Sequence, residues 1–520
     1  MSNEEKPRPE QPREARNLRE LLEERARLNP DRPALFSEAD GRRYTYAQLD
    51  AAVNATAHML AARGIVKGDV VSLLMPNSVE YIVAYFACFK LGALAGPINS
   101  LLKPQEMAYV LANSETKALL VHPEFRQSIT GVRERLPGLR HVIEFDDIEK
   151  AGAEFTREGD PPRVAVGSET EAIIIYTSGT SGKPKGCLLT HGNLIANARQ
   201  ITRWLGLTED DRLLMVMPLF HMNAVAVTTL APLYAGASTV VGPRFSAGRF
   251  WQIVSDYGVT SFGSVATMLS MLLSAYPDGI PEGLRTDQLR FAMCGSAPVP
   301  AEILRRFEET FGCLVVEGYG LSESTCRATF NPPDEGRRPG SCGMAIGNEI
   351  KIVDDEDREV AVGELGEIVL KGENIFKGYY KDPEATERAF RNGWFHTGDV
   401  GYRDHEGFLY IVDRKSDMII RGGENIYPRE IDEVLYRHAA VAEAATIGVP
   451  DALYGQEVAA FVVLKEGRQA SAEELVEFCR LHLADYKCPK TVRFVNALPK
   501  GPTGKVLKRE LVDQYVPPRS

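Results

Sequence analysis

The sequence lacks any apolar run that approaches the roughly eighteen residues needed to cross a bilayer. It also lacks the apolar core of a secretory leader, because residues 1–16 are rich in Pro, Glu and Arg. We therefore expect a disordered tail over residues 1–16, no stable membrane insertion and a cytoplasmic location.

Basic residues are in deficit: 60 Lys and Arg stand against 71 Asp and Glu, for a net charge of −11. No excess of positive charge is therefore available to neutralise the phosphates of a nucleic acid, and we expect no such partner. A hydrophobic fraction of 44% and a charged fraction of 25% are typical of a globular protein.

Closely spaced cysteine pairs are missing as well. No two cysteines have C-x-x-C spacing, which disfavours a zinc knuckle and a redox motif. Scattered thiols fit a reducing compartment. The eight are Cys88, Cys187, Cys294, Cys313, Cys326, Cys342, Cys479 and Cys488.

At 520 residues the chain is long enough for two or more domains. A capping box from Thr45 to Gln48 opens a predicted helix that stops at Gly64, and residues 79–91 predict a mostly buried helix. Short apolar runs return between helical stretches, which predicts a mainly parallel, helix-covered sheet. These runs are residues 70–74, 118–121, 173–175, 213–217, 238–241 and 291–293.

The pattern changes beyond residue 340. Residues 349–353, 366–370 and 407–412 predict short strands separated by Gly and Asp turns, as in a small antiparallel unit. Five polar residues, 413–417, then interrupt the apolar pattern. We place the domain boundary there, which gives domains of 17–415 and 416–520, the second with room for a small α+β domain.

Residues 176–186 (Tyr-Thr-Ser-Gly-Thr-Ser-Gly-Lys-Pro-Lys-Gly) are suited to a polyphosphate. Their glycines let backbone N–H groups turn toward an anion, while their hydroxyls and two lysines add donors and positive charge. The loop is no Walker A motif, because only two residues separate Gly179 from Gly182 and Pro184 replaces the Ser or Thr that would hold magnesium. A dinucleotide fingerprint is missing too, since residues 318–323 lack its third glycine.

This loop resembles the phosphate-binding signature of the adenylate-forming enzymes, which include acyl-CoA synthetases, the adenylation domains of peptide synthetases and beetle luciferases. Further motifs follow in that family's order as far as Lys505, so the resemblance covers nearly the whole chain. It implies an α/β fold with a large N-terminal domain of several subdomains, containing helix-covered sheets. It also implies a small, mobile α+β C-terminal domain.

The resemblance assigns one set of residues to ATP and its metal. Asp399 would accept two ribose hydroxyls with help from Arg414, and Tyr319 would stack on the adenine. Glu323 would bind Mg²⁺, with the Ser322 hydroxyl near the α-phosphate. The implied ATP-binding residues are Thr177, Ser178, Gly179, Thr180, Ser181, Gly182, Lys185, Gly295, Ser296, Ala297, Gly318, Tyr319, Gly320, Asp399 and Arg414.

The same resemblance implies catalytic roles for Lys505, His221 and Ser322. Lys505 ends a Thr-Gly-Lys motif and would neutralise charge that builds as a carboxylate attacks phosphorus. His221 would contact the acid. Gly422 and Gly423 would line the tunnel for the pantetheine of CoA, although two such glycines are also typical of a hairpin turn.

The residues expected to line the acid pocket are His221, Met222, Asn223, Met293, Cys294, Cys326 and Arg327. Most are apolar or soft, which favours an aliphatic acid, either fatty or short- to medium-chain. Small diacids, crotonobetaine or carnitine, and aryl acids remain alternatives. Arg327 is expected to be exposed, as arginines usually are; facing inward, it would pair with a second carboxylate or polar head. Cys326 stands where oxalate-using relatives tend to carry His, which disfavours oxalate.

The resemblance implies a two-step ligation that uses ATP, Mg²⁺ and CoA: an acyl-adenylate forms first, and a thiol then displaces AMP. Lys505 and Gly423 would serve different steps, so the C-terminal domain would rotate about a hinge at Ser416. A stand-alone adenylation module that loads a carrier protein is the alternative of another class, and dependence on CoA separates the two. The expected partners are a small carboxylic acid, ATP and CoA; a homodimer is left open.

Overall fold

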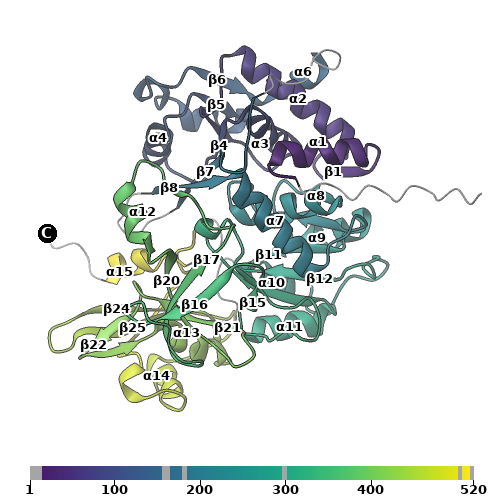
Figure 1. The fold of residues 1–520 in the computed structure, drawn as a ribbon. Helices are drawn as coiled ribbons and strands as arrows, with labels where there is room; N and C mark the ends of the chain where they lie inside the picture. The colour runs from purple at the N-terminus through teal and green to yellow at the C-terminus, as the bar shows by residue number, and fades with distance from the viewer. Residues whose placement is uncertain (1–14, 155–163, 178–183, 296–300, 502–505, 516–520) are drawn as a thin grey trace, which may run out of the picture.

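The structure is a computed structural model that describes residues 15–154, 164–177, 184–295, 301–501 and 506–515. Two large sheets form its N-terminal part, and α7 (His191–Leu205) lies between them (Figure 1). The residues of both sheets share one hydrophobic core, which includes Leu73 and Leu213. The predicted tail lies outside these ranges up to residue 14, while Ala15 is buried.

The first sheet has nine strands within those ranges, and its central strands are parallel. Its spatial order is β15 (Met344–Ala345), β14 (Thr329–Phe330), β13 (Leu314–Tyr319), β12 (Phe291–Cys294), β11 (Ser261–Ser264), β9 (Arg212–Met215), β10 (Ser238–Val241), β1 (Pro33–Ser37) and β2 (Arg43–Thr45). The apolar runs predicted around residues 213, 238 and 291 are thus strands of this sheet.

The second sheet has seven strands in the described part of the chain. Its order is β18 (Gly378–Tyr379), β8 (Lys185–Thr190), β7 (Glu171–Thr177), β4 (Leu94–Pro97), β3 (Val70–Leu74), β5 (Ala118–Val121) and β6 (His141–Glu144). The strands from β7 to β6 are parallel, whereas β8 runs antiparallel to β7.

The helices that cover these sheets begin and end largely where the sequence predicts. Thr45 and Gln48 form the predicted capping box, and the buried helix at 79–91 ends at Gly92, whose φ is 64°. The helices are α1 (Leu18–Leu28), α2 (Tyr46–Ala62), α3 (Val79–Leu91), α4 (Pro104–Asn113), α5 (Arg126–Ile129), α6 (Phe145–Glu154), α7, α8 (Ala231–Ala235), α9 (Ala247–Tyr257), α10 (Ala266–Ala275), α11 (Ala301–Phe311) and α12 (Pro383–Ala389).

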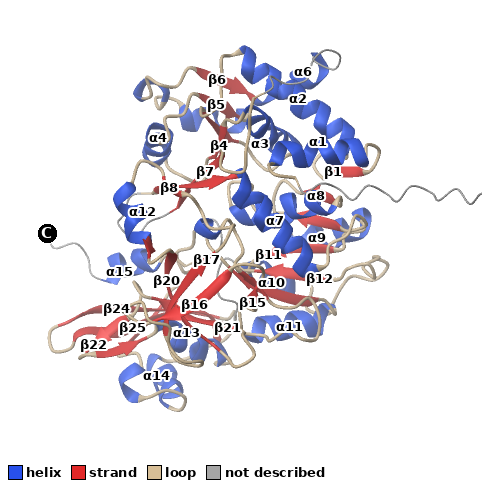
Figure 2. Ribbon diagram, in the orientation of Figure 1, coloured by secondary structure: helices blue, strands red, loops and turns tan. Residues whose placement is uncertain are grey.

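A smaller antiparallel sheet follows, as the short strands beyond residue 340 predict (Figure 2). It consists of β16 (Glu349–Val353), β17 (Gly366–Lys371), β20 (Trp394–Arg403), β19 (Phe390–Arg391) and β21 (Leu409–Arg414), the last paired with β20. Residues 415–418 lead from β21 to a further sheet, so the polar segment that we predict as a boundary joins two separate sheets.

The C-terminal sheet has its own hydrophobic core on both faces, around Ile431 and Phe461. Its strands are β23 (Glu424–Ile426), β22 (Ile419–Arg421), β25 (Gly455–Leu464), β24 (Val441–Asp451) and β26 (Thr491–Phe494), and its helices are α13 (Pro428–Arg437), α14 (Ala472–Arg480) and α15 (Lys508–Tyr515). A large α/β N-terminal domain and a smaller α+β C-terminal domain confirm the predicted fold class.

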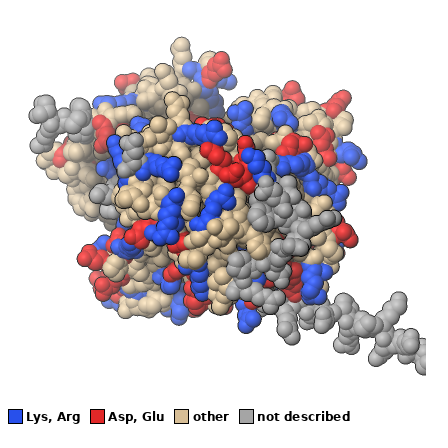
Figure 3. Space-filling view, turned by 90° about the horizontal axis from the view of Figure 1, so that it is seen from above, with Lys and Arg blue, Asp and Glu red and all other residues tan. Residues whose placement is uncertain are grey.

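The described residues contain no membrane-spanning helix, and the face seen from above carries charges of both signs. No helix there is both long and apolar enough to cross a bilayer. Seen from above, basic and acidic side chains are interspersed (Figure 3), as the modest net charge of −11 would suggest.

Candidate active site

Three residues that the sequence assigns to ATP meet in one hydrogen-bonded cluster. Asp399 on β20 and Arg414 on β21 are register partners, and Arg414 Nε lies 3.0 Å from Asp399 Oδ1. The Tyr319 hydroxyl, at the end of β13, donates to Asp399 Oδ2 at 2.6 Å. Asp399 is only 4% exposed. A cation and a phenol from two different sheets therefore hold this carboxylate in place.

The protonation states in this cluster follow from burial and charge. Burial raises the pKa of the Tyr319 hydroxyl well above its ordinary value, and the Asp399 carboxylate raises it further. Burial on its own would lower the pKa of Arg414, but the same carboxylate outweighs burial, and the pKa is raised. Tyr319 therefore stays a hydrogen-bond donor and Arg414 stays charged.

The strand ends beside this cluster approach each other so closely that only glycine fits. A Cβ on Gly320 would lie 1.9 Å from the carbonyl oxygen of Cys326, and a Cβ on Gly318 would lie 2.5 Å from the Phe330 ring. A Cβ on Gly295 would lie 2.7 Å from the Gly318 oxygen. The two residues after Gly295 that the resemblance assigns to ATP binding, Ser296 and Ala297, lie outside the described residues.

Glu323 sits in a short 3₁₀ turn, Ser322–Ser324, with its carboxylate in the interior. The Tyr379 hydroxyl donates to Glu323 Oε1 at 2.9 Å, and burial raises the pKa of the Glu323 carboxyl. A single carboxylate fits Mg²⁺, which commonly takes one or two carboxylates together with phosphate oxygens and waters. In the described residues no group of three His, Cys, Asp or Glu could hold a metal by itself, so the phosphates of ATP would have to supply further ligands.

The base of the predicted phosphate loop lies next to this turn. Thr177 and Lys185 are register partners where β7 and β8 pair. Lys185 Nζ lies 5.1 Å from the centre of the Tyr379 ring, and Tyr379 also bonds Glu323. One tyrosine thus connects the loop to the predicted metal carboxylate. The loop residues Ser178, Gly179, Thr180, Ser181 and Gly182 lie outside the described residues.

Sequence reasoning missed Tyr379. It lies on the two-residue strand β18, which pairs with β8 from nearly two hundred positions earlier in the chain. Neither the pattern around Gly378 nor any spacing indicates that pairing. A tyrosine with this role could be found only from the structure.

The residues predicted for the acid pocket gather at the ends of β11 and β12. Asn223 begins a π-helical stretch, Asn223–Leu230, and a Cβ on Gly263 of β11 would lie 3.4 Å from Asn223 Oδ1. Gly263 is in turn the register partner of Met293 on β12. π-helical turns are rare and frequently occur at functional sites. The buried members of this set are Met222, Asn223, Met293, Cys294, Cys326 and Arg327.

His221 precedes the π-helical stretch and is neutral at ordinary pH. Burial lowers the pKa of its imidazole to about 4. The ring packs on Phe220, with 4.7 Å between the ring centres, and Nε2 has no hydrogen-bond partner among the described residues. A neutral imidazole with an unused nitrogen is suited to contact an acid substrate.

Arg327 is buried, which corrects the expectation that it is exposed. It is 1% exposed, and its guanidinium carbon lies 5.1 Å from the centre of the Phe330 ring. The surface preference of arginine is overruled because residues 323–331 run through the interior without a break. The backbone N–H of Arg327 donates to Asn197 Oδ1 at 3.2 Å, and its carbonyl accepts from Nδ2 of Asn197 and of Asn374 at 2.7 and 3.1 Å.

The C-terminal domain presents the predicted CoA-binding glycines in a two-residue turn. Gly422 and Gly423 join β22 to β23 with φ of 58° and 92°, values that favour glycine, and both are exposed. Lys505 lies outside the described residues. Close to it, Lys500 and Val506 form an isolated β-bridge.

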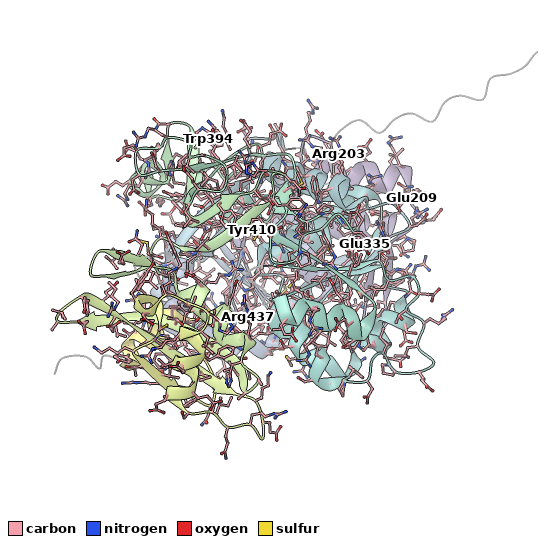
Figure 4. All side chains as sticks on the ribbon, turned by 90° about the horizontal axis from the view of Figure 1, so that it is seen from below. Arg203, Glu209, Glu335, Trp394, Tyr410 and Arg437 are labelled. Atoms are coloured by element: carbon pink, nitrogen blue, oxygen red, sulfur yellow. The ribbon has the colours of Figure 1, made fainter. Side chains whose placement is uncertain are left out.

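The predicted hinge, Ser416, is exposed and lies just after β21. The two domains touch beside it: the Arg429 N–H of α13 donates to Asp413 Oδ2 at 2.9 Å. In the view from below, Tyr410 of β21 lies near the centre, and Arg437 lies on α13 of the C-terminal domain (Figure 4). Residues 415–418 and the hydrogen bond from Arg429 to Asp413 thus connect the two domains.

The two domains correspond to two parts of one known enzyme family. Residues 22–380 match the AMP-binding enzyme family, and residues 430–505 match the AMP-binding enzyme C-terminal domain. The chain therefore belongs to the AMP-binding enzyme family, within the adenylate-forming superfamily that the sequence motifs predict.

Its relatives define the kind of enzyme more closely. The sulfoacetate–CoA ligase of Cupriavidus necator is 38% identical over 500 residues, which are 95% of this chain and 97% of that relative. The long-chain-fatty-acid–CoA ligase FadD13 of Mycobacterium tuberculosis is 36% identical over 504 residues, 96% of this chain and 99% of that relative. Among solved structures, ATP-bound MatB from Rhodopseudomonas palustris aligns with a TM-score of 0.88 at 32% identity, over 95% of this chain and 98% of that one. The chain is an AMP-forming acid–thiol ligase of the acyl-CoA synthetase type.

Proposed function

We propose that this ligase joins an aliphatic carboxylic acid to CoA through an enzyme-bound acyl-adenylate. The observations that carry the proposal are the hydrogen-bonded cluster of Asp399, Tyr319 and Arg414 and the buried apolar side chains of the predicted acid pocket, Met222 and Met293. The first is suited to a ribose and the second to an acyl chain.

The nucleotide would lie across the ends of β13 and β20. Asp399 accepts the ribose hydroxyls and the Tyr319 ring packs on the base. The backbone N–H groups of the loop after Thr177 and the ammonium of Lys185 take the phosphates. Glu323 holds a Mg²⁺ ion, which when bound supplies positive charge against the phosphate oxygens.

In the first step, a carboxylate oxygen of the acid attacks the α-phosphorus in line, an O–P bond forms, and pyrophosphate leaves. Lys505 neutralises negative charge on the reacting oxygens, and His221 positions the acid. In the second step, the thiolate of CoA attacks the carbonyl carbon, a C–S bond forms, the C–O bond to phosphate breaks, and AMP leaves.

We propose that the C-terminal domain rotates about Ser416 between these steps. The turn at Gly422 and Gly423 is exposed in the structure, and apolar side chains near it face solvent, Ile420 at 51% and Leu453 at 79% exposed. An exposed apolar tip of this kind fits a surface that docks in a second arrangement. The hydrogen bond between Arg429 and Asp413 would have to break in such a movement.

The test is mass spectrometry of the products formed from Mg-ATP and a panel of acids, each with and without CoA. The panel holds aliphatic acids of increasing length, aryl acids, small diacids and betaines. We expect acyl-CoA, AMP and pyrophosphate in equal amounts from an aliphatic acid. Acyl-adenylate that never passes to CoA would contradict the proposed acceptor and favour a carrier protein, and a preference for aryl acids would contradict the proposed substrate class.

A further inference from the structure

Arg327 has the features of a buried cation without an anion. Its side chain is fully enclosed, at 1% exposed, and its Nε and Nη2 have no hydrogen-bond partner among the described residues. No carboxylate in the described part of the chain forms an ion pair with it. Lys90, the other enclosed cation at 0% exposed, is instead bound at 2.5 Å by both Asp50 and Asn54. Of these two enclosed cations among the described residues, Lys90 has a carboxylate partner and Arg327 has none.

The guanidinium lies beside residues that the sequence predicts for the acid pocket. A Cβ on Gly295 would come within 2.6 Å of Arg327 Nη1 and 2.7 Å of Nη2, so the guanidinium rests directly against the residue that follows Met293 and Cys294. The five residues after Gly295, Ser-Ala-Pro-Val-Pro, contain no carboxylate that could pair with it. The ring of Phe330 covers it at 5.1 Å.

The backbone of Arg327 is held by two asparagine side chains. Asn197 both accepts from its backbone N–H and donates to its carbonyl, and Asn374 donates to the same carbonyl. A buried charge with unmade hydrogen bonds is strongly unfavourable unless an anion arrives in the functional state. Guanidinium groups pair best with anions that offer two oxygens, such as carboxylates and sulfonates.

We propose that Arg327 binds a second anionic group on the acid substrate, so that this ligase selects short aliphatic acids carrying a distal carboxylate or sulfonate. The inference rests on the proposed acid-ligase function and narrows its substrate class. One anionic end of the acid reacts with ATP while the other pairs with Arg327, and the methionines contact the short chain between them. A monoanionic acid leaves the guanidinium unpaired and binds poorly.

The experiment compares acids of matched length: propanoate with malonate and sulfoacetate, and butanoate with succinate and 3-sulfopropanoate. Pyrophosphate release reports the first step alone, and acyl-CoA by mass spectrometry reports both steps. We expect kcat/KM at least tenfold higher for a dianionic acid than for its monoanionic partner. Comparing kcat/KM for malonate and succinate with kcat/KM for the two sulfonates shows which distal anion the enzyme prefers.

Variants assign that preference to one side chain. Arg327→Met should lower kcat/KM for the favoured dianionic acid by at least a hundredfold, leave or raise the value for the matched monoanionic acid, and change KM for ATP less than twofold. Arg327→Lys should retain part of the preference. Arg306→Met, on the exposed face of α11, is the matched control and should behave as wild type.

The outcomes separate this inference from the function on which it rests. Thioesters formed only from monoanionic acids would overturn the second-anion site and leave the ligase function intact. An equal loss for both acids, or a rise in KM for ATP, in Arg327→Met would also overturn it. If pyrophosphate release is faster with dianionic acids but no thioester forms, the proposed role of Arg327 is supported. The same result would overturn CoA as the acceptor. If Arg327→Met does not fold, the ratio of kcat/KM for dianionic and monoanionic acids in the wild-type enzyme decides whether the second-anion site stands.

Discussion

At the scale of single residues, the nucleotide site depends on a buried charge whose partners are fixed. Asp399 is held between the Tyr319 hydroxyl and Arg414, with O···O and N···O distances of 2.6 and 3.0 Å. Such an arrangement holds the carboxylate in one orientation before a ligand arrives, so little reorganisation remains when ribose hydroxyls bind. Loss of its charge should therefore affect nucleotide use more than folding.

We predict that Asp399→Asn lowers kcat/KM for ATP roughly thirtyfold, since a hydrogen bond to a charged acceptor contributes about 2 kcal/mol. ATP–pyrophosphate exchange with a saturating acid measures the change. Asp210→Asn is the control, because Asp210 is exposed and pairs only with Arg32 at the surface. An Asp399→Asn enzyme with unchanged kcat/KM for ATP would remove Asp399 from the nucleotide site.

His221 provides a prediction about pH. Its pKa is lowered from 6.5 to about 4 by burial, so below pH 6.5 the unfolded chain takes up a proton that the folded chain refuses until about pH 4. The stability of wild type should therefore fall, relative to His221→Gln, as pH drops from 6.5 to 4, by about 2 to 3 kcal/mol. Urea unfolding of both proteins at pH 7.5 and pH 4.5 measures the difference. If the difference in unfolding free energy between the two proteins is the same at both pH values, His221 is not buried as a neutral ring.

At the scale of elements, the site is built where β12, β13 and the following turn come together with almost no space. Thr325 takes a φ of 66°, which is rare for a β-branched residue, and its hydroxyl donates to the Asn374 carbonyl at 2.7 Å. The same asparagine holds the Arg327 carbonyl. The turn after β13 is therefore a strained segment that its surroundings keep in one conformation.

We predict that Gly320→Ala destabilises the protein by about 3 kcal/mol or more and lowers activity, because the added Cβ would lie 1.9 Å from the Cys326 carbonyl oxygen and must push β13 away from the turn. Thermal unfolding and pyrophosphate release measure the two effects. Gly248→Ala on α9, where nothing lies within 4 Å of an added Cβ, should be neutral or slightly stabilising. Equal behaviour of the two variants would contradict the close packing.

The sequence predicted several helices and strands well because the features that start and end them are local. The capping box at Thr45, the Gly92 stop and the strand at 70–74 each depend on a few neighbouring residues. The pairing of strands distant in the chain could not be predicted, so Tyr379 was missed and the order of both large sheets stayed unknown. Arg327 was wrongly expected at the surface, because the average preference of arginine says nothing of the buried segment 323–331, which only the structure shows.

At the scale of the whole molecule, we propose that the small C-terminal domain contributes different residues to the two steps. The exposed Gly422–Gly423 turn is assigned to CoA and Lys505, which lies outside the described residues, to adenylation. Residues 415–418 lead from β21 into the domain that carries both. Separate variants should therefore impair separate steps.

We predict that Lys505→Ala lowers acyl-adenylate formation about a hundredfold, in line with the loss of one charge-stabilising group, and spares thioester formation from supplied acyl-adenylate. Gly423→Leu should do the reverse, because a leucine side chain narrows the path for a thin pantetheine chain. Pyrophosphate release and acyl-CoA formation are measured separately for each variant. Equal loss of both steps in either variant would remove its residue from the assigned step.

The central claim, that the acid attacks the α-phosphorus of ATP, is tested most directly with an acid whose carboxylate carries ¹⁸O at both oxygens. After turnover with Mg-ATP and CoA, mass spectrometry should find one ¹⁸O in each AMP, because the oxygen that attacks phosphorus stays with AMP when the thiolate breaks the C–O bond. The thioester should retain the other. Label in inorganic phosphate with ADP as product, or AMP without label, would contradict the account.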